Sequence, residues 1–182
     1  MSSVSESLQP EPGKERKMEI RKTTLEDLET VMAIYARARA FMAANGNPRQ
    51  WANNNWPPES LIRQDIADGN SYVCIMEDGE IVSTFFYKFG ENAEPGYAAI
   101  EDGAWIGEDT YGVMHRMAVS GTVKGAATFC MEWCYQQSGH LRGDTHPDNK
   151  PMQGVFKKLG FQYCGIIHVV EDNDPRYAYE KL

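Results

Sequence analysis

The sequence predicts one α/β domain with a mixed sheet of six to seven strands flanked by helices. A chain of 182 residues can build one sizeable core but is short for two domains. Apolar residues alternate between strand and helix periodicity along the chain, and one segment has the order strand, glycine loop, helix, strand. Because a hairpin pairs its strands antiparallel and a strand–helix–strand unit pairs them parallel, we expect both kinds of pairing.

The N-terminal segment is predicted to lie outside this domain. Residues 1–17 combine Ser, Glu, Pro and Lys with almost no apolar side chains. Such a segment cannot bury enough surface to offset the entropy lost on ordering. We therefore expect residues 1–17 to be a disordered tail and residues 18–182 to form the domain.

A short strand and a helix begin the domain. The strand is expected over 19–22. Thr24 and Asp27 then form the pattern of a capping box, which marks a helix start. Apolar residues follow at helical spacing up to Gly46, so an amphipathic first helix is predicted.

Residues 45–56 are rich in Asn, Gly and Pro, which exclude a continuous regular element. Trp51 and Trp56 lie in this segment, and two exposed indole rings would be unfavourable. Either the edge of the core or a bound ligand can cover them. A second helix is predicted over 59–68, and Gly69 can end it.

The next segment has the alternation of strands. Two apolar runs flank Asp78-Gly79, which predicts a β-hairpin beginning at residue 71. Residues 90–109 are rich in glycine and carry Tyr97, which favours a long loop with one helical turn. Loops of this length are often functional.

The segment over 111–137 has the order strand, glycine loop, helix. One face of the strand would carry four side chains: Val113, His115, Met117 and Val119. The loop between Gly121 and Gly125 leads into the helix, whose free N–H groups and dipole suit a phosphate. Lys124 can add a full positive charge there. The same residues also fit an ordinary strand-to-helix turn.

The C-terminal part is predicted to contain a strand over 141–144 and a helix over 150–159 that Gly160 ends. Two closing strands are expected over 161–170 and 177–181. The complete order is β-α-α-β-β-β-α-β-α-β-β, without an internal repeat.

Two segments resemble the GNAT family of N-acetyltransferases. MAVSGTVKGAATF is similar to the family's cofactor segment, whose basic, glycine-rich loop wraps the pyrophosphate of acetyl-CoA, and Lys124-Gly125 matches its usual Arg-Gly. DTHPDNKPMQGVFKKLGF is similar to the family's strand, asparagine, helix and terminal Gly-Phe, with Asn149 and Gly160-Phe161 as the matches. The resemblance implies that the fourth and fifth strands splay apart and admit the acyl-CoA arm.

The resemblance also implies which residues contact acetyl-CoA. The backbone of the central strand would polarise the thioester carbonyl, and the loop and helix start would hold the pyrophosphate. The implied cofactor-binding residues are Met117, Ala118, Val119, Val123, Lys124, Gly125, Ala126, Ala127, Thr128, Asn149 and Phe156. Phe156 stands where the family often has a tyrosine that acts as general acid, so that role is not carried over.

His115 is the best candidate for a general base. Direct acyl transfer needs an uncharged amine, a proton acceptor and donors to the oxyanion, and imidazole titrates near neutrality. His115 is expected to share a face with Met117 and Val119, and Arg116 on the opposite face to form an ion pair. A histidine satisfied within the sheet is the alternative. Three residues crowd the end of the next strand: Asp144, His146 and Asp148. One of them could relay a proton, or they could only cap the following helix.

The resemblance implies an acceptor site near the first two helices. Trp51 and Trp56 would then wall an acceptor pocket, and Tyr87 is assigned to the same pocket. The implied function is acetyl-CoA-dependent N-acetyl transfer to a small-molecule or peptide amine. The alternative is an acyl-CoA-binding or regulatory domain without turnover, which three departures from the family pattern favour: Ala127, Phe129 and Phe156.

Composition restricts partners and compartment. The chain has 26 acidic and 18 basic residues and a net charge of -8, which argues against nucleic acid and is compatible with a cationic or amine substrate. The four cysteines form no CxxC pair, so we expect reduced core residues and no metal site. No apolar run approaches the roughly 20 residues of a membrane span, and no signal peptide is evident. These features predict a cytoplasmic protein, with homodimerisation left open.

Overall fold

The structure is a computed structural model that describes residues 17–169 and 173–182. Its first part contains β1 (Met18–Lys22), the 3-10 turn η1 (Leu25–Asp27), α1 (Leu28–Ala44), α2 (Glu59–Ala67), β2 (Ser71–Met76), β3 (Ile81–Glu91) and the 3-10 turn η2 (Pro95–Ala98). The remainder contains β4 (Thr110–Val119), α3 (Ala126–Ser138), β5 (Leu141–Thr145), α4 (Lys150–Lys158), β6 (Gln162–His168) and β7 (Pro175–Lys181). The predicted helices and strands are present, with ends within two residues of those expected.

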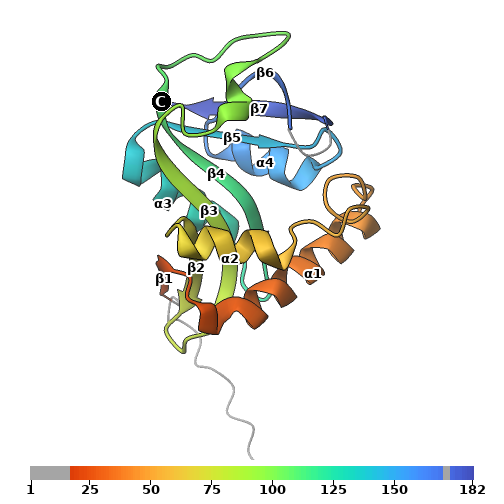
Figure 1. The fold of residues 1–182 in the computed structure, drawn as a ribbon, viewed down its shortest axis with the longest axis vertical. Coiled ribbons are helices and arrows are strands. Elements are labelled where there is room, and N and C mark those ends of the chain that lie inside the picture. Colours follow the sequence, from red (N-terminus) through yellow and green to blue (C-terminus); the bar gives the residue numbers. More distant parts are fainter. Residues whose placement is uncertain (1–16, 170–172) are drawn as a thin grey trace, which may run out of the picture.

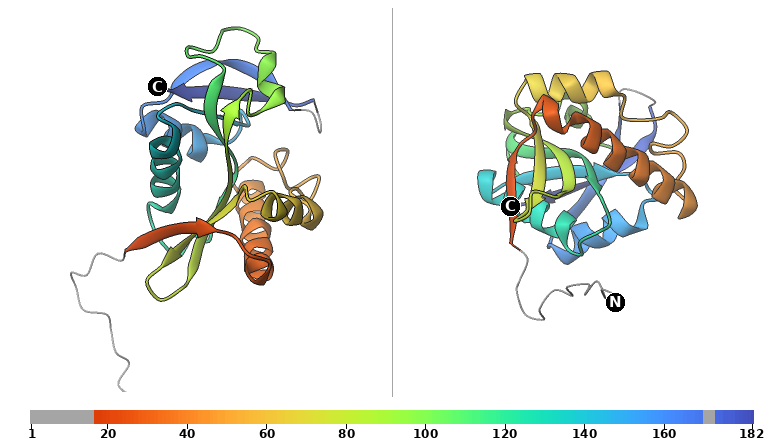
Figure 2. Two further views of the ribbon diagram at one scale, coloured as in Figure 1. Left: turned by 60° about the vertical axis from the view of Figure 1, so that its left-hand side comes forward. Right: turned by 90° about the horizontal axis from the view of Figure 1, so that it is seen from below.

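Within the described residues, seven strands form one sheet in the order β1-β2-β3-β4-β5-β7-β6 (Figure 1). The helices α1 and α2 lie on one face, and α3 and α4 lie on the other (Figure 2). The predicted mixed sheet flanked by helices is therefore confirmed. The tail predicted over residues 1–17 lies, apart from Lys17, outside the described residues.

The pairing of β4 with β5 is parallel and short. It comprises Gly112 with Leu141, Val113 with Arg142 and Met114 with Gly143. The other neighbouring pairs within the described ranges are antiparallel. Because β4 continues beyond these pairs to Val119, the two strands diverge as the resemblance implied.

Each face of the sheet has its own apolar core. On the α1–α2 face, the buried residues of α1 are Leu28, Val31, Ile34, Tyr35 and Ala38. On the other face, residues of α3 and α4, including Cys130 and Phe156, pack against β2, β3 and β4. A third cluster forms around Tyr97, Tyr111 and Val113, where the segment that carries η2 covers the sheet. The four cysteines are free and buried.

A β-bulge at Arg116 breaks the alternation of β4. Arg116 has a φ of 54°, and the pairing of β3 with β4 shifts between Thr84 and Phe86. An extra residue in one strand turns the side chains that follow it to the other face. Met117 accordingly packs in the α3–α4 core, whereas Val113 belongs to the third cluster. The prediction that Met117 and Val119 share a face with His115 was therefore wrong.

Candidate active site

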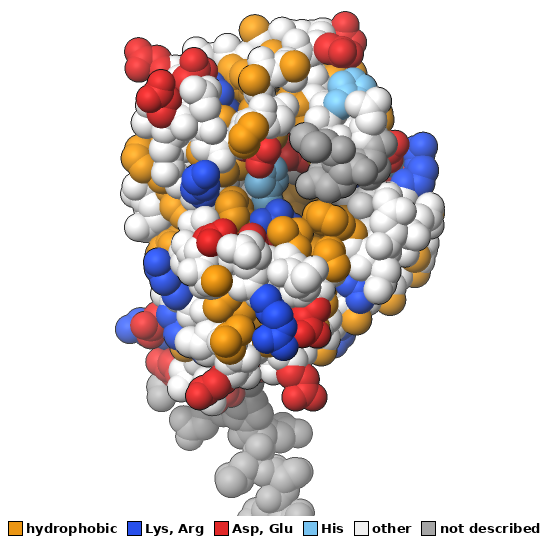
Figure 3. Space-filling view, in the orientation of Figure 1, with side chains coloured by type: hydrophobic (Ala, Val, Ile, Leu, Met, Phe, Trp, Pro, Cys, Tyr) orange, Lys and Arg blue, Asp and Glu red, His pale blue; other side chains and the backbone are white. Residues whose placement is uncertain are grey.

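A cavity of about 160 Å³ lies where β4 and β5 diverge. Its walls come from the segment between α1 and α2, the end of η2, the bulged part of β4, the end of β5, the start of α4 and the β6–β7 hairpin. Figure 3 shows the hollow in this face, with acidic, histidine and basic side chains set among hydrophobic ones. The cavity combines an apolar wall with converging polar groups, which is typical of small-molecule sites.

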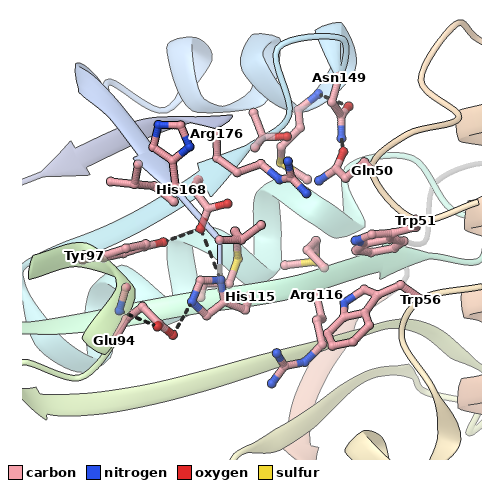
Figure 4. A pocket seen from close by; sticks show the side chains of 18 of the residues that line it. Gln50, Trp51, Trp56, Glu94, Tyr97, His115, Arg116, Asn149, His168 and Arg176 are labelled. Atoms are coloured by element: carbon pink, nitrogen blue, oxygen red, sulfur yellow. Dashed lines mark hydrogen bonds and ion pairs between the residues drawn. The ribbon is translucent and has the colours of Figure 1, made fainter. Parts of the chain in front are cut away.

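His115 lies in this cavity between two carboxylates (Figure 4). Its Nε2 is 3.0 Å from Oε2 of Glu94, and its Nδ1 is 3.4 Å from Oδ2 of Asp144. The imidazole ring also meets the ring of Tyr97 edge to face, with centroids 5.7 Å apart. The side chain is 18% exposed, so a ligand can reach it.

Tyr97 fixes the carboxylate of Asp144. Its hydroxyl donates to Oδ2 of Asp144 over 2.6 Å. Burial, and then the negative charge of Asp144, raise the pKa of Tyr97 well above its ordinary value. The phenol therefore stays protonated at neutral pH and remains a donor. Asp144 is thus held in place facing Nδ1 of His115.

The two carboxylate oxygens of Glu94 have different partners: one is held by the backbone of η2, and the other faces His115. Glu94 is the N-cap of η2, and its Oε1 accepts from the N–H of Gly96 over 3.0 Å, while Oε2 faces His115. Burial alone would raise the pKa of Glu94, but the hydrogen bond and charge of His115, with the N–H of Gly96 and the charge of Arg116, outweigh this effect and lower the pKa. Glu94 is therefore ionised at neutral pH. Sequence reasoning missed this residue, although Pro95 is the kind of residue that begins a helical turn and so marks position 94 as its N-cap.

Arg116 forms the predicted ion pair. Its Nε and Nη2 donate to the two carboxylate oxygens of Asp65 on α2, each over 3.0 Å. Burial raises the pKa of Asp65, and Arg116 opposes this shift. The guanidinium lies 4.5 Å from the ring centroid of Phe86, a ring that also meets His115. Arg116 is therefore on the same side of the sheet as His115, because the bulge turns it there, and the predicted opposite face was wrong.

Trp51 and Trp56 line the opposite part of the cavity (Figure 4). Both also pack in the α1–α2 core, where Trp51 meets Tyr35 edge to face with centroids 5.8 Å apart. Core packing, one of the two alternatives left open by the sequence, is thus present, and both rings also line the cavity. Whether these rings contact an acceptor stays a prediction.

The segment that carries the tryptophans is tied to the start of α4. Oε1 of Gln50 accepts from Nδ2 of Asn149 over 3.0 Å, and Nη2 of Arg49 donates to Oδ2 of Asp148 over 2.8 Å. Asn149 also caps α4, because its side chain accepts from the N–H of Met152. Asn149 lines the cavity, as does Met117, so these two predicted cofactor residues lie near His115.

Tyr87 and Phe156, both assigned to the site, do not line the cavity. Tyr87 follows Phe86 on β3 and therefore points to the opposite face, where it packs against Tyr72 and Trp133. Its assignment to the acceptor pocket was wrong. Phe156 is fully buried and stacks on Tyr179 with centroids 4.5 Å apart, so it offers a ligand no surface. Its assignment to cofactor binding was wrong for this reason.

The predicted phosphate loop lies between β4 and α3. Gly121 and Gly125 have φ of 81° and 83°, values that favour glycine. The first bond of the helix runs from the N–H of Phe129 to the carbonyl of Gly125 over 2.9 Å, which leaves the N–H groups of 126–128 without a helical partner. Lys124 is exposed beside them. Phosphate binding by residues 123–128 stays a prediction.

Of the three acidic or histidine residues at the end of β5 and just after it, Asp144 is the one that meets His115. His146 is buried, and its Nδ1 accepts from the N–H of Asp148 over 3.0 Å. Burial, and then the charge of Arg176, lower the pKa of His146. His146 therefore shapes the turn before α4, and Asp144 is the residue placed to assist a proton transfer.

Metal ligands and membrane spans were also sought. Over residues 17–169 and 173–182, no group of three or more His, Cys, Asp and Glu side chains could hold a metal ion. The helices in these ranges are too short or too polar to span a membrane.

Comparison with known proteins assigns the fold to a class of enzymes. Residues 17–162 match the family model described as an acetyltransferase (GNAT) domain. The chain belongs to the GNAT acetyltransferase family, which supports an acyltransferase activity in general terms. None of the curated proteins matches the sequence.

Solved structures agree with this assignment. A GNAT-family acetyltransferase from Streptococcus agalactiae 2603 is 30% identical, with 91% of this chain and 95% of that chain covered and a TM-score of 0.81. GNAT-family acetyltransferases from Listeria monocytogenes 4b F2365 and Bacillus cereus ATCC 10987 are 17% and 19% identical, with TM-scores of 0.66 and 0.59. They cover 90% and 91% of this chain and 94% and 99% of their own. These two share the fold.

Proposed function

We propose that the protein transfers an acetyl group from acetyl-CoA directly to an amine, with His115 as the general base. The observation that carries this proposal is the position of His115, which lies in a cavity at the divergence of β4 and β5 and between two carboxylates. A base for this reaction must be within hydrogen-bond reach of the acceptor nitrogen. The cavity lets an amine approach the imidazole.

The residues present fit acetyl-CoA. Beyond Met114, β4 has no β5 partner within the described ranges, and its edge can bind an extended acyl arm through backbone groups other than the carbonyls of Arg116 and Ala118, which accept from Tyr35 and Ser83. The unpaired N–H groups at the start of α3 and the charge of Lys124 suit the pyrophosphate. Acetyl-CoA, when bound, supplies an activated thioester. In this proposal Met117–Val119 lie along the thioester, and 123–128 hold the phosphates.

The proposed chemistry needs few protein groups. The acceptor nitrogen must be uncharged to attack the thioester carbonyl, and His115 accepts the proton that it loses. The C–N bond forms as the C–S bond breaks; one proton of the ammonium group goes to His115, and the second proton that the nitrogen loses ends on the sulfur of CoA. Overall, a protonated amine and acetyl-CoA give the amide, CoA thiol and one proton, and His115 is the group that accepts and later releases that proton. Asp144, fixed by Tyr97, stabilises the imidazolium formed in between.

The proposal is tested by measuring thiol release from acetyl-CoA with a panel of amines. We expect the wild type to release thiol only when an amine is present. His115→Ala should lower turnover by about 10²- to 10⁴-fold, the usual contribution of a general base, and leave CoA affinity in calorimetry unchanged.

Two outcomes would contradict the proposal. Undiminished turnover in His115→Ala would place the base elsewhere. CoA binding without turnover for every amine would favour the acyl-CoA-binding alternative, which the replacement of the family's tyrosine by the buried Phe156 supports.

A further inference from the structure

The charges around the cavity leave an acidic end. Arg116 is neutralised by Asp65, and Nη1 of Arg176 lies 3.7 Å from Oδ2 of Asp174. Glu94 and Asp144 both face His115. Since one imidazole carries at most one positive charge, two carboxylates around it leave at least one negative charge uncompensated. This end of the cavity therefore favours a cation.

Glu94 is built to present one oxygen to a ligand. The N–H of Gly96 holds Oε1, so the carboxylate keeps its orientation when the contact of Oε2 changes. Oε2 and Nε2 of His115 lie 3.0 Å apart at the cavity. An ammonium group has several N–H donors and can donate to both atoms once the imidazole is neutral. His115 can then take the ammonium proton, which leaves the uncharged nucleophile that acyl transfer needs.

The other end of the cavity carries large apolar side chains, with the polar side chains of Gln50 and Asn54 near them. Met42, Trp51 and Trp56 line it, and Figure 4 shows both indole rings on the side away from Glu94. The whole cavity, its acidic end included, has a volume of about 160 Å³, close to the ~150 Å³ of a cavity that holds a benzene-sized molecule. The space therefore suits a small acceptor whose apolar group is compact.

We propose that Glu94 selects the acceptor, and that the acceptor is a protonated primary amine with a compact apolar substituent. The ammonium group lies between Glu94 and His115, and the apolar group lies on Trp51 and Trp56. This inference rests on the proposed function and names its substrate class. An amino acid with a free carboxylate beside its amine is a poor acceptor, because that carboxylate would meet the negative charge of Glu94 and Asp144.

The test measures amine binding without acetyl-CoA, by calorimetry and by tryptophan fluorescence. The probes are 2-phenylethylamine, the neutral 2-phenylethanol of similar shape, and phenylalanine. The variants are Glu94→Gln, which removes the charge and keeps the acceptor oxygen for Gly96, and Glu91→Gln, which removes an equal charge from the exposed end of β3.

We expect the wild type to bind 2-phenylethylamine more tightly than either other probe. Glu94→Gln should weaken binding of this amine about 10- to 100-fold, the range for a hydrogen bond to a charged group, with 2-phenylethanol unchanged. Glu91→Gln should bind as the wild type does. Glu94→Asp, which keeps the charge on a shorter side chain, should recover part of the loss.

Equal affinity of the wild type for the amine and the alcohol would overturn the inference, as would undiminished amine binding in Glu94→Gln or no amine binding at all. If Glu94→Gln unfolds, the role of Glu94 is still tested by Glu94→Asp and by the affinities of the wild type for the three probes. The outcome is separate from that of the proposed function. Absence of thiol release by the wild type would contradict acetyl transfer, whereas the binding measurements alone decide the role of Glu94.

Discussion

Arg116 shapes the site through both its backbone and its side chain. Its positive φ makes the bulge, and the hydroxyl of Tyr35 on α1 donates to its carbonyl over 3.0 Å, which satisfies a backbone group that the bulge removes from the ladder. Its side chain binds Asp65 on α2. A single position therefore joins β4 to both helices of one face and sets the direction of the side chains on either side of it.

Loss of Asp65 should be costly to stability. Asp65→Ala leaves the guanidinium of Arg116, whose side chain is 15% exposed, without its counterion, and breaking such a buried pair costs about 3–5 kcal/mol. The measurement is urea unfolding. Glu59→Ala is the matched control on α2, since it removes a carboxylate from an exposed pair with Arg63 and should cost about 0.5 kcal/mol or less. Equal losses in the two variants would show that burial does not strengthen the Arg116 pair.

Individual contacts of the site could not be predicted from the sequence. The run from Met114 to Val119 has the same residue types with or without a bulge. The alternation alone therefore placed His115 and Met117 on one face of the sheet, whereas the bulge turns them to different faces. The contact of Glu94 with His115 joins a loop to a strand across 21 positions, and no local pattern encodes it. His115 itself was found because its residue type and its strand matched a known chemistry.

At the scale of elements, the periodicities were sufficient. The helix and strand patterns, together with glycines at the ends of elements, correctly predicted the helices and strands of the described residues. These patterns can be read from residues close together in the sequence. Tyr87 shows the limit of this reasoning: the period-2 pattern of β3 defines two faces, but the sequence does not say which face meets the cavity. Packing against Trp133 on α3 decides it.

The loop between β4 and α3 provides a test at this scale. Lys124→Glu should weaken CoA binding by about 1–3 kcal/mol, because it removes a charge-assisted contact and adds repulsion to the phosphates. Calorimetry with CoA measures the effect. Lys88→Glu makes the same charge change at an exposed position of β3 and should leave the affinity nearly unchanged. Equal effects of the two changes would mean that overall charge, and not the loop, accounts for binding.

At the scale of the whole molecule, the sheet has two parts that meet at the three pairs of β4 with β5. Loops reinforce this junction. The segment between α1 and α2 binds the start of α4, and Glu101 pairs with Ile166 of β6. Glu180 on β7 also accepts from the N–H of Ile106 and from Arg142. The cavity lies within this junction, so both parts of the sheet shape it.

Glu180 should contribute stability that depends on pH. Burial would raise its pKa, but the N–H of Ile106, Arg142 and His140 together lower it. A carboxyl whose pKa is lowered by folding contributes its full stabilisation at pH values above its pKa in the unfolded chain, about 4.3. This contribution is lost as the pH falls from there through the lower pKa of the folded state. Glu180→Gln should cost about 3–5 kcal/mol at pH 7, since Arg142 is buried.

The measurement is unfolding by urea from pH 7 to pH 3. The wild type should lose stability below about pH 4, and the difference from Glu180→Gln should narrow there. A constant difference over this range would show that the charge of Glu180 does not account for its effect.

The early end of the pairing between β4 and β5 has one more consequence. Past Met114, β4 pairs with β3 on one side, and no β5 residue of the described ranges pairs with it on the other. A substrate arm bound along this edge would occupy the place of a missing strand. If the arm binds in this way, as proposed above, the substrate extends the protein's own secondary structure, and this edge of β4 is paired only in the complex.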